Sequence, residues 1–234
     1  MEIRFVVATR KSEDEFWSAS QTGQSLKFLK IGKANVRLFP ENTQGLPIIY
    51  NQAIKETIGK PVLLIFAHDD ISILDFFWIR RILDGLETFK IIGVAGSTSR
   101  ISFQPSWIFS ALTIDQNNQV TFTREAPENL SGVVAHGSGY PPARLDIYGK
   151  AFQKVALLDG LLMAAKNQTF FENSLFFDER FMFDHYDLDL CRQAELLGLD
   201  IGTCLLSIIH SSTGNFKSDT FIASYKKYID KWKD

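Results

Sequence analysis

Polar residues that can hold a cation, His68-Asp69-Asp70, come just after the apolar run Pro61–Phe66. In a parallel α/β sheet, ligands bind beyond the carboxyl ends of the strands, so these side chains are expected at a binding edge. Two adjacent carboxylates beside a histidine repel one another unless a cation or a donor group neutralises them. Mg²⁺ or Mn²⁺ suits this position, because these ions take one or two carboxylates and complete their coordination with substrate phosphates. An equal alternative is an aspartate pair that caps the next helix, with Asp70 or Ser72 at the N-cap.

A second acidic cluster extends from Asp178 to Asp189, in the sequence DERFMFDHYDLD, and places five acidic side chains in twelve residues. A helix is expected to begin here, so Asp187 and Asp189 fall in its first turn, where the helix dipole favours a carboxylate by about 0.3–1 kcal/mol. Helix capping accounts for one of these aspartates and leaves the others as candidates for chemistry. His210 directly follows the apolar run Gly202–Ile209. A lone histidine at a strand end is by itself more typical of a structural residue.

The first part of the chain alternates between short apolar strands and amphipathic helices. Strands are predicted at Ile3–Ala8, Val36–Phe39, Pro61–Phe66 and Ile91–Val94, and helices at Ser12–Ala19, Leu46–Ile58 and Leu74–Leu86. The first helix opens on a capping box formed by Ser12 and Glu15, and the second has Pro47 in its first turn. This βαβαβαβ order predicts the α/β class, with a mostly parallel sheet and helices on both faces.

The middle of the chain, Ser97–Lys150, has a different composition and is rich in Thr, Ser, Gly and Pro. Short alternating runs such as Gln119–Thr123 predict an inserted antiparallel or loop region there. Helical and strand signals resume at Ala156–Ala165, Tyr186–Leu197, Asp200–Ile209 and Asp219–Lys233. No linker or repeat divides the chain, so one mixed domain over residues 1–234 is expected.

The composition limits the classes of function. The chain has 234 residues, of which 45% are hydrophobic, and this is enough for a large buried core. Its net charge of -2 gives no sign of nucleic-acid binding. No apolar stretch reaches about 18–20 residues, and the N-terminal apolar run is too short for a signal peptide. Cys191 and Cys204 lie in apolar sequence, as expected of reduced core thiols, so a cytoplasmic protein is predicted, with any membrane contact peripheral at the inner membrane face.

Taken in order, five motifs resemble those of the inverting glycosyltransferases of the family 2 type, which have the GT-A fold. The motifs are ENTQGLPIIYNQAI, FAHDDI, Leu158-Asp159-Gly160, FDERF with HYDLDLCRQAELLG, and IIHSSTG. They span about residues 3–215, and the string HYDLDLCRQAELLG looks closest to a small bacterial branch. The resemblance implies a GT-A-like fold with a nucleotide-sugar-binding half, about 1–96, and an irregular acceptor-side and catalytic half, about 97–234.

The resemblance also implies roles for the metal ligands and the catalytic base. His68 and Asp70 occupy the outer positions of the DXD-type motif, with Asp70 as the direct contact to Mn²⁺ or Mg²⁺. His210 matches a histidine that completes the metal site. Asp187 falls where the family keeps its catalytic base, and Asp189 is expected as a neighbour that assists it.

The donor is expected over the strand ends. The predicted nucleotide-sugar-binding residues share a position at a strand end or in one of the motifs: Thr9, Arg10, Glu41, Asn42, Asn51, Asp69 and Asp159. Asp69 is expected to face the sugar or the ribose, whereas Arg10 fits an ordinary surface arginine equally well. Trp107, Tyr140 and Tyr148 offer aromatic rings that an acceptor sugar can pack against, although aromatic residues are more often part of the core.

These expectations describe an inverting, metal-assisted transfer of a sugar from a nucleotide diphosphate-sugar, with a UDP-sugar as first donor. The acceptor is expected to be a carbohydrate or glycolipid hydroxyl in polysaccharide biosynthesis. The Gln-x-x-Arg-Trp motif and membrane helices are missing, which disfavours a processive synthase. A non-catalytic glycosyltransferase-like binding module is the main alternative, because His68 and Tyr186 replace acidic residues of the family. A sugar-nucleotidyltransferase fits less well, because ATRKSEDEF lacks the usual glycine-rich loop.

Overall fold

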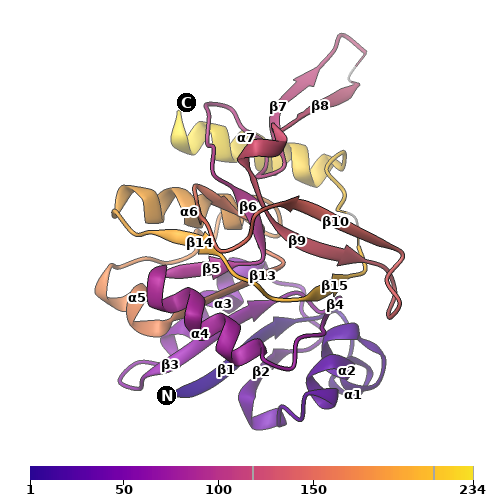
Figure 1. The fold of residues 1–234 in the computed structure, drawn as a ribbon. Helices are drawn as coiled ribbons and strands as arrows, with labels where there is room; N and C mark the ends of the chain where they lie inside the picture. Colours follow the sequence, from indigo (N-terminus) through magenta and orange to yellow (C-terminus); the bar gives the residue numbers. More distant parts are fainter. Residues whose placement is uncertain (118, 213, 234) are drawn as a thin grey trace.

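Two β-sheets form the framework of the computed structural model, which describes residues 1–117, 119–212 and 214–233 (Figure 1). The larger sheet has seven strands in the order β11-β14-β5-β13-β3-β1-β2. The second sheet has the order β12-β6-β9-β15-β4, with β10 beside β9, and β7 and β8 form a separate hairpin. The strands are β1 (Glu2–Ala8), β2 (Val36–Phe39), β3 (Val62–Ala67), β4 (Ile71–Ile73), β5 (Ile91–Gly93), β6 (Ala95–Ser97), β7 (Phe109–Ile114), β8 (Val120–Arg124), β9 (Leu130–His136), β10 (Arg144–Gly149), β11 (Lys154–Val155), β12 (Leu157–Leu158), β13 (Leu162–Lys166), β14 (Ile201–Thr203) and β15 (Ile208–His210). The helices are α1 (Glu13–Ala19), α2 (Gln21–Phe28), α3 (Leu46–Lys55), α4 (Trp78–Thr88), α5 (Asn167–Glu172), α6 (Tyr186–Leu196) and α7 (Asp219–Trp232), with short 3₁₀ turns at Lys33–Asn35 and Pro127–Asn129.

The first three strands confirm the parallel arrangement that the sequence predicts. β1 lies between β2 and β3 and runs parallel to both, with Phe5 paired with Val36 on one side and Ile65 on the other. The carboxyl ends of the three strands therefore meet at one edge of the sheet. β3 is buried along its whole length, as its continuous apolar run indicates. Helices cover the sheet, with α4 in front of it and α3 behind it in the view of Figure 1.

A strand from the second half of the chain completes the large sheet. β13 lies between β3 and β5 and runs antiparallel to both, so Met163 pairs with Phe66 and with Gly93. The sheet is therefore mixed, and the two halves of the sequence share it. The middle of the chain is antiparallel, as predicted, because β9 pairs in this way with β6 and β10.

Two segments differ from the sequence-based expectation. The helix predicted from Leu74 begins later, at Trp78, because β4 and its following turn come first. The single strand predicted over Gly202–Ile209 divides into β14, in the larger sheet, and β15, in the second sheet. β15 pairs antiparallel with β4, and its last residue, His210, lies opposite the first residue of β4. This pairing brings His210 beside Asp70, which directly precedes β4.

Local signals account for the helix starts. α1 begins at the predicted capping box, in which the Ser12 hydroxyl accepts from the Glu15 N–H at 3.3 Å and the Glu15 carboxylate accepts from the Ser12 N–H at 2.9 Å. A helix that the sequence analysis did not include, α2, follows at once, because the Ser20 hydroxyl caps it. Cys191 and Cys204 are buried and free, as expected of core thiols. Among the described helices, none has both the length and the apolar character needed to cross a bilayer.

Candidate active site

A cavity of about 450 Å³ lies at the carboxyl edge of the parallel strands. The carboxyl ends of β1 and β3, with the residues that follow β3, form one part of its lining. The start of α6 forms another, and the second sheet contributes residues of β9, β10 and β15. The predicted residues that line it are His68, Asp69, Asp70, Asp159, Asp187 and His210. Segments more than a hundred residues apart in the sequence therefore meet at the edge where an α/β sheet binds its ligands. Thr213, in the IIHSSTG motif, lies outside the described residues.

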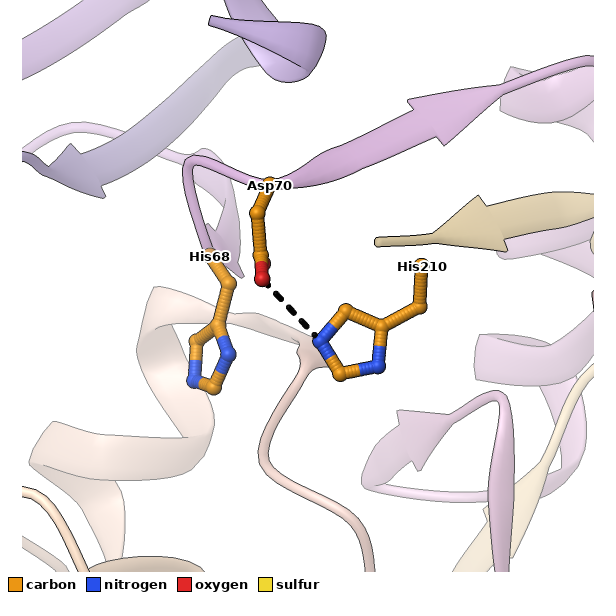
Figure 2. A group of neighbouring side chains, drawn as sticks. All are labelled: His68, Asp70 and His210. Atoms are coloured by element: carbon orange, nitrogen blue, oxygen red, sulfur yellow. Dashed lines mark ion pairs between the residues drawn. The ribbon is translucent and has the colours of Figure 1, made fainter. Parts of the chain in front are cut away.

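Three side chains in this cavity form a candidate metal site, shown in Figure 2. One ligand atom from each of His68, Asp70 and His210 lies within 4.8 Å of the other two. Asp70 Oδ2 is 3.4 Å from His210 Nε2, and Asp70 Oδ1 is buried without a hydrogen-bond partner among the described residues. A buried carboxylate oxygen without a donor is expensive to keep. The three ligand atoms therefore fit a bound cation.

The Asp70–His210 contact also shapes the charge of the site. Burial raises the pKa of Asp70, but hydrogen bonding and attraction to His210 outweigh it, so the net shift is downward. Burial lowers the pKa of His210, and its contact with Asp70 more than reverses this, so its pKa is raised. The carboxylate is therefore ionised at neutral pH, as a metal ligand must be.

Tyr186, the residue that replaces a glutamate of the resembling family, fixes the orientation of His68. The Tyr186 hydroxyl donates to the carbonyl oxygen of Gly160 at 2.9 Å and lies 3.1 Å from His68 Nε2. Because the hydroxyl has only one proton and gives it to the carbonyl, His68 Nε2 must be the donor to the tyrosine oxygen. The lone pair of His68 is then on Nδ1, which Figure 2 shows on the side facing Asp70 and His210. Two imidazoles and one carboxylate favour Mn²⁺ over Mg²⁺, because Mg²⁺ prefers oxygen ligands.

Removing the tyrosine hydroxyl gives a direct test of this orientation. Tyr186→Phe is expected to weaken Mn²⁺ binding by about 10–100-fold, the usual effect of removing a group that orients a histidine ligand. The ring remains packed against Tyr50 and Phe177, so the fold is expected to survive. Titration calorimetry with Mn²⁺ measures the affinity, and an unchanged affinity would contradict the assigned role of the hydroxyl.

Asp187 is half-buried in the first turn of α6 and faces the same cavity. Its Oδ2 accepts from the Gly160 N–H at 2.9 Å and its Oδ1 from the Leu188 N–H at 2.9 Å. Burial, and then the negative charge of Asp159, raise the pKa of Asp187 to about 7. A Cβ at Gly160 would overlap the Tyr186 hydroxyl and lie 3.0 Å from the Cβ of Asp187, so glycine is needed here. The carboxylate is thus fixed in place and has a pKa of about 7, which suits a general base.

Asp189, expected to assist Asp187, does not line the cavity. Residues two apart on a helix point to different sides, so the two carboxylates diverge. Asp189 is fully buried and lies 2.6 Å from Lys231 Nζ, while its Oδ1 also accepts from Trp232 Nε1 at 3.0 Å. Gln193 donates to its other oxygen at 2.8 Å. The structure thus gives Asp189 the role of holding α7 against α6.

Replacing Asp189 should therefore affect stability more than chemistry. Asp189→Ala leaves Lys231, Trp232 and Gln193 without this partner and is expected to destabilise the fold by about 3 kcal/mol. Chemical denaturation measures the change in the free energy of unfolding. Well below the melting transition, any activity of the cavity should stay near the parental level in the protein that remains folded. A loss of activity in fully folded protein would instead place Asp189 among the residues that the chemistry needs.

The residues predicted to bind the nucleotide-sugar differ in their position relative to the cavity. Thr9 is buried, and its hydroxyl donates to Asp69 Oδ2 at 2.5 Å, so it orients a carboxylate of the cavity. Asp159 lines the cavity and accepts from the Leu161 N–H at 3.1 Å. Arg10 is exposed and is not part of the cavity lining.

The other three predicted donor residues also lie outside the cavity lining. Glu41 is exposed, and Asn42 stabilises its turn by donating to the Gln44 carbonyl oxygen at 2.8 Å. Asn51 is buried and both donates to and accepts from the backbone of Phe177, at 2.8 and 3.0 Å. Its contacts tie α3 to the segment before α6, which is a structural role.

Several cavity residues were missed by the sequence analysis. His136 ends β9, lies opposite His210 in the parallel register, and has its ring 5.8 Å from the His210 ring. Its Nε2 is 3.4 Å from Asp146 Oδ2. One signal was available: the runs LIFAH, GVVAH and SIIH each place a histidine directly after buried apolar residues. Arg124, Arg144 and Asp184 also line the cavity.

Two of the three aromatic residues expected to contact an acceptor sugar lie together in the cavity. Trp107 and Tyr148 line the cavity and pack edge to face, with ring centroids 4.9 Å apart. Tyr140 is 83% exposed and lies beside a different hollow. Phe216 and Phe221 extend the apolar wall on the side of α7.

Comparisons with known proteins support the fold. No family model matches the sequence, and no curated protein matches it significantly. A crystal structure of GalNAc-T7 with UDP, GalNAc and Mn²⁺ superposes with a TM-score of 0.52 and 9% identity, covering 98% of this chain and 48% of that chain. A crystal structure of S. aureus TarS, residues 1–349, gives a TM-score of 0.45 and 13% identity over 90% of this chain and 60% of that chain. This chain thus spans about half the length of GalNAc-T7, and the superposition on that structure confirms the predicted GT-A-like α/β fold.

Proposed function

We propose that this chain is a glycosyltransferase, consisting of a single GT-A-like domain, that moves a sugar from a nucleotide diphosphate-sugar to an acceptor hydroxyl with inversion. One observation carries the proposal: a single cavity presents both the His68–Asp70–His210 group and the fixed carboxylate of Asp187. A transferase of this type needs a site for the leaving diphosphate and a base for the incoming hydroxyl. GalNAc-T7 was crystallised with UDP, GalNAc and Mn²⁺, so a UDP-sugar is the first donor to test.

Different residues of the cavity are assigned to metal binding and to proton transfer in this reaction. His68, Asp70 and His210 would hold Mn²⁺, or less favourably Mg²⁺, which supplies charge neutralisation at the leaving diphosphate. Asp187 takes the proton of the acceptor hydroxyl, whose oxygen attacks the anomeric carbon from the face opposite the leaving group. The backbone N–H groups of Gly160 and Leu188 fix the carboxylate for this transfer.

The remaining assignments extend the proposal to donor and acceptor. Asp69 and Asp159 are the proposed ligands of the sugar or ribose hydroxyls, and the hydrogen bond from Thr9 to Asp69 and the place of both aspartates in the cavity lining support this. The nucleobase is assigned to the ends of β1 and β2, where Arg10, Glu41 and Asn42 lie. The acceptor is a carbohydrate or glycolipid in cytoplasmic polysaccharide biosynthesis, and the side of the cavity formed by the second sheet is its proposed site.

A non-catalytic binding module is the second candidate. The feature that favours it is Tyr186, which directly precedes Asp187 at the position where the resembled family has an acidic residue. The two functions differ in the release of nucleotide diphosphate from a panel of nucleotide sugars with Mn²⁺ and no acceptor. Release from any donor excludes the binding module, whereas donor binding without release, with or without acceptors, contradicts the transferase.

The raised pKa of Asp187 sets an expected pH dependence. Only the ionised carboxylate takes a proton, so kcat/KM is expected to rise as the pH increases through about 7 and to level off above it. A carboxylate with an ordinary pKa would give a flat profile over this range. Steady-state rates in overlapping buffers give the profile, and its rising limb is expected to disappear in Asp187→Asn.

A further inference from the structure

Three exposed phenylalanines that do not line the candidate active site lie close together. Phe28 at the end of α2 is 70% exposed, and Phe76 and Phe77, between β4 and α4, are 72% and 69% exposed. The rings of Phe28 and Phe76 have their centroids 6.0 Å apart. Single exposed apolar residues need no explanation, but a contiguous apolar area marks an interaction site.

A second apolar area lies next in the chain to these rings, because Leu74 precedes Phe76 by two residues. Leu74 donates its backbone N–H to the Ser207 carbonyl oxygen at 2.9 Å, which joins it to the segment before β15. Leu74, Leu145 and Leu205, each exposed, line a mostly apolar hollow of about 550 Å³ there. Figure 1 shows α2, β4 and the β9–β10 hairpin along one side of the molecule. We call the surface formed by Phe28, Leu74, Phe76, Phe77, Leu145 and Leu205 the aromatic face.

The charge around the three phenylalanines has the sign opposite to that of the whole chain. Residues 27–30 and 74–84 contain four cations, Lys27, Lys30, Arg80 and Arg81, and two acids, Asp75 and Asp84, whereas the chain has a net charge of -2. Arg81 pairs with Asp75 and Arg80 with Asp84. Lys27 and Lys30 have no acidic partner within the described part of the chain. The aromatic face thus combines protruding rings with a local excess of positive charge.

From this combination we propose that the aromatic face docks on the surface of an anionic phospholipid bilayer. Phenylalanine rings enter the boundary between headgroups and acyl chains, and cations beside them pair with anionic headgroups. A second copy of the chain fits less well, because a two-fold interface places each surface against itself and would oppose the same cations. The inference does not depend on the proposed function.

Vesicle sedimentation tests the proposal with the intact chain. The protein is expected to bind vesicles of phosphatidylglycerol and phosphatidylcholine, and to bind vesicles of phosphatidylcholine alone about tenfold less. The variant Phe28→Ser/Phe76→Ser/Phe77→Ser is expected to lower binding to the anionic vesicles by about tenfold or more. The matched control is Ile58→Ser/Leu196→Ser, which removes two side chains that are 67% and 77% exposed elsewhere. It should bind as the parent does.

A second variant separates the charges from the rings. Lys27→Gln/Lys30→Gln keeps every phenylalanine and is expected to lower binding to anionic vesicles several-fold, and added salt should do the same to the parent. Equal loss in the control variant, or no binding of the parent to anionic vesicles, overturns the proposal. So does a parent that is dimeric without lipid and becomes monomeric in the triple phenylalanine variant, because the face is then a dimer interface.

Discussion

Replacing Asp187 with asparagine is expected to lower the rate of sugar transfer by about 10²–10⁴-fold, the usual contribution of a general base. Asparagine has nearly the same size, but its amide does not take a proton from an acceptor hydroxyl. Donor binding should stay near the parental level, because the candidate metal ligands His68, Asp70 and His210 are untouched. The measurement combines a transfer assay with the thermal shift caused by a UDP-sugar and Mn²⁺.

The stability of the same variant shows whether lost activity comes from lost structure. The pKa of Asp187 is about 7 in the fold, against an ordinary value of 3.8 for an aspartate in the unfolded chain. Ionising it therefore destabilises the folded state increasingly as the pH rises between these values. Asparagine has no such charge, although it gives up one of two backbone hydrogen bonds, about 1 kcal/mol. The difference in melting temperature, Asp187→Asn minus parent, should therefore be more positive at pH 8 than at pH 5 in metal-free buffer.

Another carboxylate in the cavity provides the contrast to Asp187. Asp184 lines the cavity, and burial raises its pKa to about 6, so it is the alternative base. Asp184→Asn is expected to keep the transfer rate within about tenfold of the parent. Parental activity in Asp187→Asn, with the large loss found in Asp184→Asn instead, would show that the base has been assigned to the wrong residue.

The position of Asp70 at the cavity follows from the sequence alone. Asp70 follows β3, and the rule that parallel strands end at a binding edge is enough to locate it. His210 needs more, because only the pairing of β15 with β4 brings it to Asp70. No local pattern contains that pairing, and the ordered motifs of a resembling family supplied it. The fold class was predicted from strand and helix periodicity in the first part of the chain, where β1, β2 and β3 are parallel.

The positions that the sequence did not predict have physical causes that can be traced to particular residues. Asp189 was grouped with Asp187 by sequence distance, although a helix points residues two apart to different sides. Asn51 belongs to a motif of the resembling family, yet its amide is used by the backbone of Phe177. His136 was missed because its stretch was read as irregular, and its place in the cavity depends on β9 joining the same sheet as β15. Long-range pairing of this kind leaves little trace in local sequence.

Replacing Asp70 with alanine is expected to abolish the Mn²⁺-dependent part of donor binding. Asp70 supplies the only carboxylate of the three candidate ligands, and its Oδ1 is the buried oxygen that has no hydrogen-bond donor among the described residues. Two neutral imidazoles bind a divalent ion far more weakly than the same pair with a carboxylate, so an affinity loss of at least about 100-fold is expected. Titration with Mn²⁺ alone measures it without any need for turnover.

The matched control for Asp70→Ala is Asp146→Asn, which removes a charge near His136 in the same cavity but outside the candidate triad. It should keep Mn²⁺ affinity close to that of the parent, because a nearby charge alone contributes less than a ligand atom. In the parent, Mn²⁺ should bind more tightly than Mg²⁺, since two of the three ligand atoms are imidazole nitrogens. If Asp70→Ala retains the Mn²⁺-dependent thermal shift with a UDP-sugar, the ion is held elsewhere. The buried Oδ1 of Asp70 would then need another donor to explain it, with a donor sugar hydroxyl as the nearest chemical alternative.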